Sequence, residues 1–259
     1  MPTAFITGAT AGIGAAFARR LASDGFDLVL LARDTERLER AAAELRDRYA
    51  VRTEALTADL ATEEGLAAAE ERVRTDVGLL VNNAGFANKG VFLDVPVSDE
   101  LTMLKVHCEA VLRLTHAALP GMLERGRGGV INVSSVSAFA TRGTYGASKA
   151  WAVAFSEGVA ADIRRRSEGG VHVMALCPGF VHTEFHDRAQ MDMSDVPGFM
   201  WLDKDDVVDA ALRDLRRGVQ VSVPSPQYKA IVGATRFLPR GLLARISSGT
   251  GRKYRRVST

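Results

Sequence analysis

Two residues that could move a proton stand four positions apart in the segment TYGASK, Tyr145 and Lys149. A tyrosine has a pKa of about 10, too high for proton exchange near neutrality, and a neighbouring ammonium lowers that pKa by stabilising the phenolate. On a helix, positions i and i+4 share one face, so both side chains would point into the same pocket. A solvated Tyr and Lys on an exposed helix would give the same pattern, so the rest of the chain has to decide.

A glycine-rich segment near the start of the chain has the composition of a phosphate-binding turn. TGATAGIG places Gly8, Gly12 and Gly14 between an apolar run and an amphipathic segment. Glycine permits tight backbone geometry there, and the amide groups at a helix N-terminus attract a pyrophosphate. Any tight join between strand and helix can use glycine, but this order of elements favours a dinucleotide.

The end of the second apolar run, LVLLARDTERLE, predicts which dinucleotide binds. About 20 residues after such a turn an Asp or Glu favours NAD, whereas an Arg accepts the 2′-phosphate of NADP. Arg33 stands there, and a guanidinium binds phosphate through charge-assisted hydrogen bonds. Asp34 is expected to cap the following helix. We therefore predict NADP(H) as cofactor, with NAD(H) bound through Asp34 as the alternative.

These side chains need a scaffold, and the sequence predicts alternating strands and helices. Several apolar runs lack alternation, as expected for strands covered by helices on both faces. The expected strands span 3–7, 27–32, 52–57, 78–83, 129–134, 171–177 and 219–224. The expected helices span about 13–24, 35–49, 63–76, 98–123, 143–166 and 204–217. This pattern predicts the α/β class, with a single doubly wound parallel sheet in one domain over 1–259.

The composition, with 47% hydrophobic and 25% charged residues, is typical of a globular protein. No apolar run approaches the roughly 20 residues that cross a bilayer, and MPTAFITG does not resemble a secretory signal. Cys108 and Cys177 lie far apart, which suits a reducing cytosol and argues against a disulfide framework or zinc site. His107 and Cys108 point in different directions on a helix, so they are not expected to share a metal. We expect a cytoplasmic protein without a metal site.

Positive charge gathers toward the carboxyl end of the chain. The formal net charge is +2, yet ten basic residues and no acidic residue follow Asp214. We interpret 226–259 as a solvated basic extension, with no nucleic-acid partner. Attachment of this segment to nucleic acid or an anionic membrane is the alternative. It predicts salt-sensitive binding that disappears on truncation after Ser225.

A long segment without a clear element, 179–203, precedes the last expected helix. A loop of this length in a compact domain is usually a lid or a binding segment. Its aromatic and methionine residues make adaptable apolar walls: Phe180, Phe185, Met191, Met193, Phe199, Met200 and Trp201. We predict a substrate lid and a bulky or hydrophobic substrate.

Four motifs, in order along the chain, resemble those of the short-chain dehydrogenase/reductase family. TGATAGIG (7–14) is similar to the T-G-x-x-x-G-x-G turn of that family, and NNAG (82–85) is similar to its second motif. The pair Tyr145 and Lys149 resembles its catalytic pair, and PGFVHT (178–183) resembles its P-G-x-V-x-T segment beside the nicotinamide. The resemblance implies a Rossmann-type fold and an NAD(P)-dependent oxidoreductase. It also implies a homodimer or homotetramer, built through the helices at 98–123 and 143–166.

The resemblance further implies roles for single residues. Asp59 would lie near the adenine ring, and Lys149 would also bond the nicotinamide ribose. Asn82 would line the cofactor, and it is equally suited to tying neighbouring strands together. Val181 and Thr183 would contact the carboxamide. The remaining residues expected to line the cofactor are Gly8, Thr10, Gly12, Ile13, Gly14, Leu60, Ala84, Gly85, Tyr145, Pro178 and Gly179.

Ser135 aligns with the catalytic serine of the family, whose hydroxyl orients and polarises the carbonyl, and Ser134 and Ser137 are alternatives. Ser135 lies ten positions before Tyr145, a shorter interval than is usual in the family. His107 aligns with an asparagine that kinks the preceding helix and holds a water in the proton relay from the lysine. A histidine can donate and accept hydrogen bonds, so His107 either joins that relay or is a packed helix residue.

These observations predict an NADPH-dependent reductase of ketones or aldehydes, with Tyr145 as acid/base, Lys149 lowering its pKa and Ser135 positioning the carbonyl. One alternative is an NAD-dependent alcohol dehydrogenase of the same fold. Another is a nucleotide-binding redox sensor without turnover, although a sensor has no need of all three catalytic side chains. The substrate and the direction of the reaction are not predicted.

Overall fold

A seven-stranded parallel sheet forms the centre of the computed structural model, which describes residues 2–140, 143–166, 169–185, 189, 193 and 196–235. Its strands are β1 (Thr3–Thr7), β2 (Asp27–Ala32), β3 (Thr53–Thr57), β4 (Val77–Asn82), β5 (Gly128–Val133), β6 (Val171–Leu176) and β9 (Val221–Ser222). The spatial order β3-β2-β1-β4-β5-β6-β9 reverses direction between β1 and β4. The predicted doubly wound sheet is confirmed, and its switch point lies where β1 and β4 end.

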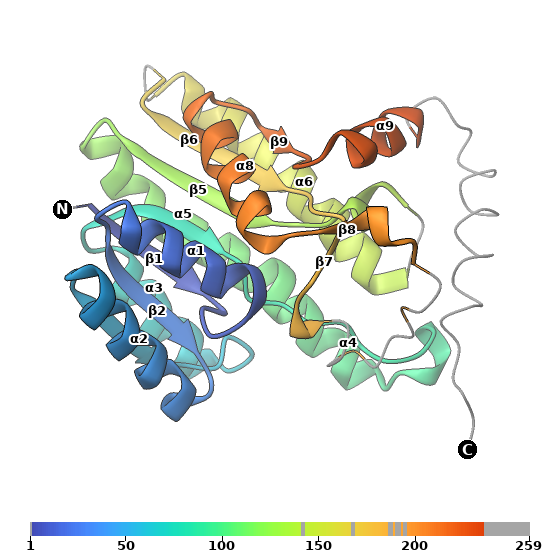
Figure 1. Cartoon of the computed structure of the whole chain (residues 1–259), viewed down its shortest axis with the longest axis horizontal. Helices are drawn as coiled ribbons and strands as arrows, with labels where there is room; N and C mark the ends of the chain where they lie inside the picture. The colour runs from blue at the N-terminus through green and yellow to red at the C-terminus, as the bar shows by residue number, and fades with distance from the viewer. Residues whose placement is uncertain are drawn as a thin grey trace.

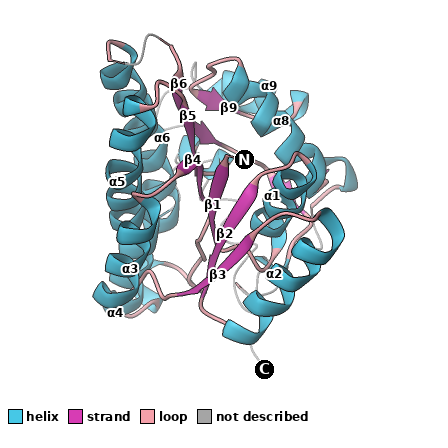
Figure 2. Ribbon diagram, turned by 90° about the vertical axis from the view of Figure 1, so that its left-hand side faces the viewer, coloured by secondary structure: helices cyan, strands magenta, loops and turns pink. Residues whose placement is uncertain are grey.

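Helices cover both faces of the sheet (Figure 2). One face carries α1 (Gly12–Ser23), α2 (Thr35–Tyr49) and α8 (Lys204–Arg216), and the other carries α3 (Glu63–Val73), α5 (Ala110–Glu124) and α6 (Gly143–Arg164). Each face has its own apolar cluster, one around Phe17 and Leu30 and the other around Phe5 and Leu114. Burial on both faces explains why β1 and β2 are apolar except at their ends, where Thr3, Thr7 and Asp27 stand.

Short polar side chains cap the starts of three helices, α2, α3 and α8. Asp34, Thr62 and Asp203 each accept a backbone hydrogen bond at the start of α2, α3 and α8. Such caps satisfy the amide groups that the first helical turn leaves without partners. The residue before α1 is Ala11, which provides no cap, and the first turn of α1 contains no acidic residue. The positive end of α1 is therefore open to an anionic ligand.

The helix expected at 98–123 is interrupted. It divides into α4 (Val97–Leu104), a π-helical turn η2 (Lys105–Glu109) and α5. A π-turn adds a residue to the helical repeat and often marks a functional site. His107 lies within this turn. The interruption therefore changes the direction of the side chain that aligns with the relay asparagine.

The segment 179–203 contains short elements that the sequence did not predict. Within its described part, β7 (Phe180–Val181) pairs with β8 (Trp201–Leu202), and a 3-10 turn, η4 (Gly198–Met200), precedes β8. Figure 1 shows β7 and β8 beside the central sheet, with α9 (Pro226–Thr235) farther along the chain. Met191 and residues 236–259, which include most of the basic extension, lie outside the described residues.

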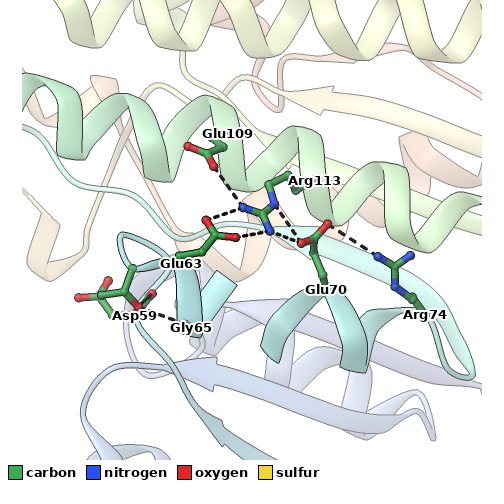
Figure 3. Close-up of polar contacts among 8 residues, drawn as sticks. Asp59, Glu63, Gly65, Glu70, Arg74, Glu109 and Arg113 are labelled. Carbon is green, nitrogen blue, oxygen red and sulfur yellow. Dashed lines mark hydrogen bonds and ion pairs between the residues drawn. The ribbon is translucent and has the colours of Figure 1, made fainter. Parts of the chain in front are cut away.

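An ion-pair cluster joins α3 to α5. The Arg113 guanidinium contacts Glu63 and Glu70 on α3 and Glu109 one turn before it, with Nη1 3.2 Å from Glu109 Oε1 and 2.9 Å from Glu63 Oε2 (Figure 3). These carboxylates raise the pKa of Arg113. Shared partners reduce the side-chain entropy lost per ion pair, so the cluster favours a fixed spacing between the two helices. None of the helices in the described part of the chain is long and apolar enough to span a membrane.

Candidate active site

The predicted functional side chains follow the carboxyl ends of neighbouring parallel strands, where open α/β sheets bind their ligands. Thr7, at the end of β1, organises this edge. Its hydroxyl accepts hydrogen bonds of 2.9 Å from the amides of both Asn83 and Ala84. The side-chain nitrogen of Asn83, Nδ2, in turn donates to the backbone carbonyls of Thr7 and Gly8. The glycine-rich turn and NNAG are thereby joined into one surface.

The glycine-rich turn leaves no room for side chains where it meets its neighbours. A Cβ added to Gly14 would lie 2.2 Å from the Gly8 carbonyl oxygen, and one added to Gly12 would lie 3.1 Å from Thr183. Helix α1 therefore begins directly beneath the turn, with its uncapped amide groups at the carboxyl edge of the sheet. Backbone N–H groups in this position and the helix dipole fit a pyrophosphate. The residues present thus fit a dinucleotide.

At the end of β2, Arg33 is exposed, and no hydrogen bond or ion pair joins it to another described residue. Asp34 accepts a 3.0 Å hydrogen bond from the Arg37 amide and so caps α2, as predicted. At the end of β3, the Asp59 carboxylate accepts a 2.9 Å bond from the Ala61 amide, beside the buried Leu60. The neighbourhood of Arg33 suits a 2′-phosphate better than a ribose hydroxyl, because the nearest carboxylate is already used by the helix.

Asn82 is fully engaged inside the fold. Its amide nitrogen donates to Asn132 on β5 at 2.8 Å and to Thr115 on α5 at 3.2 Å. Asn132 in turn donates to Ser156 on α6 at 3.0 Å. The ladder confirms that Asn82 ties neighbouring elements together. Its amide nitrogen is committed to these partners, so a contribution to the cofactor is expected through the backbone.

Tyr145 and Lys149 lie on one face of α6, as their spacing predicted. Lys149 Nζ lies 5.7 Å from the centre of the Tyr145 ring. It also donates a 3.1 Å hydrogen bond to the Val133 carbonyl at the end of β5. The lysine is only 7% exposed, and this burial lowers its pKa to about 8. An ammonium ion with a lowered pKa next to a phenol is suited to proton transfer.

The three candidate serines have different surroundings. Ser134 is buried, and its hydroxyl donates a 2.7 Å bond to the Lys149 carbonyl, so it serves the fold. Ser135 is half-buried, precedes the short 3-10 turn η3 (Val136–Phe139) and bonds the Ser137 hydroxyl at 3.1 Å. The turn η3 that follows Ser135 packs against α6, the helix that carries Tyr145 and Lys149. The geometry favours Ser135 over Ser134.

His107 bridges two parts of the site. Its Nε2 accepts a 3.1 Å hydrogen bond from the Phe86 amide, and its Nδ1 lies 2.9 Å from the Ser148 hydroxyl. Ser148 already donates its proton to the Tyr145 carbonyl, so Nδ1 must be the donor toward Ser148. The imidazole is therefore neutral, in agreement with a pKa lowered well below its usual value by burial and by the Lys149 charge. Both ring nitrogens have protein partners.

Aromatic side chains surround Tyr145. Its ring centre lies 5.8 Å from that of His107 and 6.0 Å from that of Phe185, and Phe86 contacts His107 on the other side. A Cβ added to Gly85 would lie 2.8 Å from His107 Nε2 and 3.5 Å from Lys149 Nζ. NNAG, the π-turn and helix α6 thus converge around the tyrosine.

Tyr228 on α9 anchors the segment 179–203 at both ends. Its hydroxyl accepts a 3.0 Å hydrogen bond from the Phe180 amide and donates a 2.9 Å bond to the Met200 carbonyl. A Cβ on Gly179 would lie 2.0 Å from the Tyr228 ring, so only glycine fits beneath it. Val181 is buried on β7, and the Pro178 carbonyl accepts from the Val136 amide.

The structure brings Ser135, Tyr145, Lys149, His107 and NNAG to one end of the sheet and places the glycine-rich turn and Thr183 beside each other. Thr10 and Ile13 lie in that turn and at the start of α1. Sequence reasoning missed three contributors to this geometry: Thr7, Ser148 and Tyr228. Thr7 carried a signal, because it precedes the glycines in the motif. Tyr228 carried none, because nothing near it in the sequence indicates which segment its hydroxyl reaches.

Comparison with known proteins gives a consistent picture. The family profile described as short chain dehydrogenase matches residues 2–194. The chain is 37% identical over 187 residues to serine 3-dehydrogenase of Rhizobium radiobacter, covering 71% of this chain and 73% of that protein. It is 34% identical over 193 residues to very-long-chain 3-oxoacyl-CoA reductase of Anas platyrhynchos, covering 70% of this chain. That match spans 60% of the length of the duck reductase.

Two solved structures resemble the whole chain. A short-chain dehydrogenase from Sphingobium yanoikuyae in complex with NADPH has a TM-score of 0.81 at 35% identity, covering 100% of this chain and 98% of that one. A bulky-bulky ketone specific alcohol dehydrogenase from Comamonas testosteroni has a TM-score of 0.78 at 28% identity, covering 100% and 97%. The likeness therefore extends beyond the residues that the family profile matches.

Proposed function

The chain belongs to the short-chain dehydrogenase family, and from this premise we propose that it is a reductase that converts a ketone or an aldehyde to an alcohol with NADPH. Oxidoreductase chemistry at carbonyl or alcohol groups follows from the family. The finer proposal rests on one observation above all: Tyr145 and the buried Lys149 share a face of α6 beside the end of β5.

Proton transfer is assigned to Tyr145. A bound NADPH would supply a hydride for the carbonyl carbon, and the carbonyl oxygen would then need a proton. The Tyr145 hydroxyl donates it, and the positive charge of Lys149 stabilises the phenolate that remains. Burial makes this interaction strong, because few waters screen a charge that is 7% exposed. Lys149 is also proposed to bond the ribose hydroxyls of the cofactor.

Ser135 is proposed to hold the carbonyl oxygen of the substrate. Its hydroxyl is paired with Ser137, a partner that it can exchange for a substrate oxygen, whereas Ser134 is committed to Lys149. His107 is proposed to act as a positioning residue, which ties the Phe86 backbone beside NNAG to Ser148 on α6. A water in the proton relay would then need a partner other than the two imidazole nitrogens.

NADP(H) is the proposed cofactor, held by the uncapped start of α1 and by Arg33. The capping role of Asp34 supports this choice over NAD(H), because a carboxylate bound to its own helix is less available to a ribose. The family contains users of both cofactors: one related structure carries NADPH and another carries NAD.

A bulky or hydrophobic carbonyl compound is the proposed substrate class. The support is the apolar character of the described part of the lid. There the ring centres of Phe180 and Trp201 lie 5.9 Å apart, and the Phe185 ring contacts the Tyr145 ring. A homodimer or homotetramer is also proposed, because Leu101 and Leu112 expose apolar side chains on α4 and α5. The two free thiols, Cys108 and Cys177, favour the cytoplasm as its location.

The test is isotope transfer across a panel of ketones and aldehydes of increasing bulk. With NADPH deuterated at the transferable position of C4, the alcohol product should carry deuterium on the former carbonyl carbon. We expect kcat/KM to be higher with NADPH than with NADH, and higher for bulky ketones than for acetone. Binding of NADPH without turnover of any compound would favour a redox sensor. An NADH preference that persists in Arg33→Ala would favour the NAD-dependent dehydrogenase.

A further inference from the structure

An ion pair joins the start of α2 to the base of the lid. Arg37 donates through both terminal nitrogens to Glu184, with Nη1 3.2 Å from Oε2 and Nη2 2.5 Å from Oε1. The Nη1/Nη2 edge of the guanidinium is thus occupied by one carboxylate. The two side chains are 35% and 47% exposed, so the pair contributes little to stability. Its position suggests a different role.

The pair spans two walls of the proposed cofactor site. Arg37 lies in the first turn of α2, four residues after Arg33, and its own amide is held by Asp34. Glu184 directly follows Thr183, the residue that contacts the glycine-rich turn at Gly12. The Arg37 side chain therefore reaches from the end of β2 toward the phosphate-binding turn and the lid. The 2′-phosphate of NADP(H) is expected in the same region, beside Arg33.

A phosphate and a carboxylate use the same groups of an arginine. Both bind a guanidinium edge through two parallel charge-assisted hydrogen bonds, so the Nη1/Nη2 edge of Arg37 cannot make a bidentate contact with both at once. A phosphate dianion carries more charge than Glu184 and competes well for this edge. NAD(H) lacks this phosphate and would leave the pair intact.

We propose that Glu184 competes with the 2′-phosphate of NADP(H) for Arg37, so that this pair helps to set the preference between NADP(H) and NAD(H). The proposal rests on the use of NADP(H) proposed above.

A double-mutant cycle on cofactor binding tests the competition. Dissociation constants of NADPH and NADH are measured for the full chain at low ionic strength, by nucleotide fluorescence and without substrate, in wild type, Glu184→Gln, Arg37→Met and the double variant. We expect Glu184→Gln to tighten NADPH about two- to fivefold and to leave NADH within about twofold. In the Arg37→Met background, Glu184→Gln should change neither constant. Arg37→Met alone should weaken NADPH more than NADH.

Glu36→Gln is the matched control, because it removes an exposed carboxylate from the same helical turn without touching Arg37. If Glu36→Gln tightens NADPH as much as Glu184→Gln does, the effect is general charge and the proposal is wrong. It is also wrong if Glu184→Gln leaves NADPH affinity unchanged, weakens both cofactors, or tightens NADPH equally without Arg37. Failure of wild type to bind NADPH would instead refute the proposed cofactor. Thermal melts of each variant exclude unfolding as the cause.

Discussion

Lys149 carries its proton in a place where burial opposes the charge. Among the described residues, its Nζ has one protein hydrogen-bond acceptor, the Val133 carbonyl. A lysine normally titrates near 10.4, but here desolvation lowers the pKa to about 8. The ammonium ion and the neutral amine are therefore close in free energy near the working pH. The lowered pKa of Lys149 leads to a prediction about the pH dependence of the reaction.

We predict that kcat/KM for carbonyl reduction falls as the pH rises above about 8. The reason is that Lys149 loses its proton there, and a neutral amine no longer stabilises the Tyr145 phenolate. Lys149→Arg keeps its charge to higher pH and should move the fall upward at a lower overall rate. An identical pH profile in this variant would contradict the assignment.

His107 predicts a different pH effect, on stability rather than on rate. Its folded-state pKa lies well below that of the unfolded chain, which is near 6.5. Above that pH the imidazole is neutral in both states and contributes nothing. Below it the unfolded chain binds a proton that the folded protein cannot, so the free energy of unfolding falls by up to roughly 1.4 kcal/mol per pH unit.

We therefore expect His107→Asn to lose less stability than wild type between pH 6.5 and 5.5, by about 1 kcal/mol in urea unfolding. His116→Asn is the matched control, because His116 is exposed on α5 and should lose stability in parallel with wild type. Parallel curves for all three proteins would mean that His107 is not held neutral in the folded state.

At the scale of elements, the lid depends on a helix that lies outside it. The Tyr228 hydroxyl on α9 joins β7 to the residue that precedes β8, so one side chain fixes both ends of the segment 179–203. Tyr228 is buried, and loss of its hydroxyl would remove a hydrogen-bond partner from a backbone donor and from a backbone acceptor. The cost of leaving such groups unpaired exceeds the net value of one hydrogen bond.

We predict that Tyr228→Phe lowers the free energy of unfolding by about 1–3 kcal/mol and raises KM for the carbonyl substrate. Tyr49→Phe serves as the control, because Tyr49 is a partly buried tyrosine on α2, away from the lid. Urea unfolding and steady-state kinetics measure the two effects. Equal stability and equal KM in wild type and Tyr228→Phe would show that the Tyr228 hydroxyl contributes neither to stability nor to substrate binding.

The interruption of the helix at η2 is a feature that local sequence patterns do not predict. KVHCE has no proline or glycine to break a helix, and the sequence predicts one continuous element. The π-turn is stabilised instead by long-range contacts, as His107 reaches the Phe86 amide and Ser148. These partners lie 21 and 41 positions away in the chain, so no window of local sequence contains the signal.

At the scale of the molecule, the doubly wound sheet predicted from the sequence is confirmed. Strands β1 and β2 and helix α2 have the predicted bounds, because they are apolar or amphipathic over their whole length with clear ends. Strand β9 is shorter than predicted because only Val221 and Ser222 pair with β6 at the sheet edge. Helix α9 was missed because its buried residues, Tyr228 and Val232, give too short a pattern.

In the candidate site, too, some features depend on local sequence and others depend on long-range contacts. Tyr145, Lys149 and the glycine-rich turn could be predicted because their chemistry depends on local spacing. The bridge through His107, the anchor through Tyr228 and the pair between Arg37 and Glu184 depend on contacts between distant segments. Their geometry therefore required the fold. The central claim needs both kinds of information, since the tyrosine comes from the motif and its buried lysine partner from the structure.

The most direct test of that claim is single-turnover carbonyl reduction by Tyr145→Phe with NADPH. The change removes only the hydroxyl, so we predict that NADPH still binds within about twofold of wild type while the rate falls about 10²–10⁴-fold, the usual contribution of a general acid. A variant that binds NADPH normally and reduces the carbonyl at nearly the wild-type rate would contradict the account.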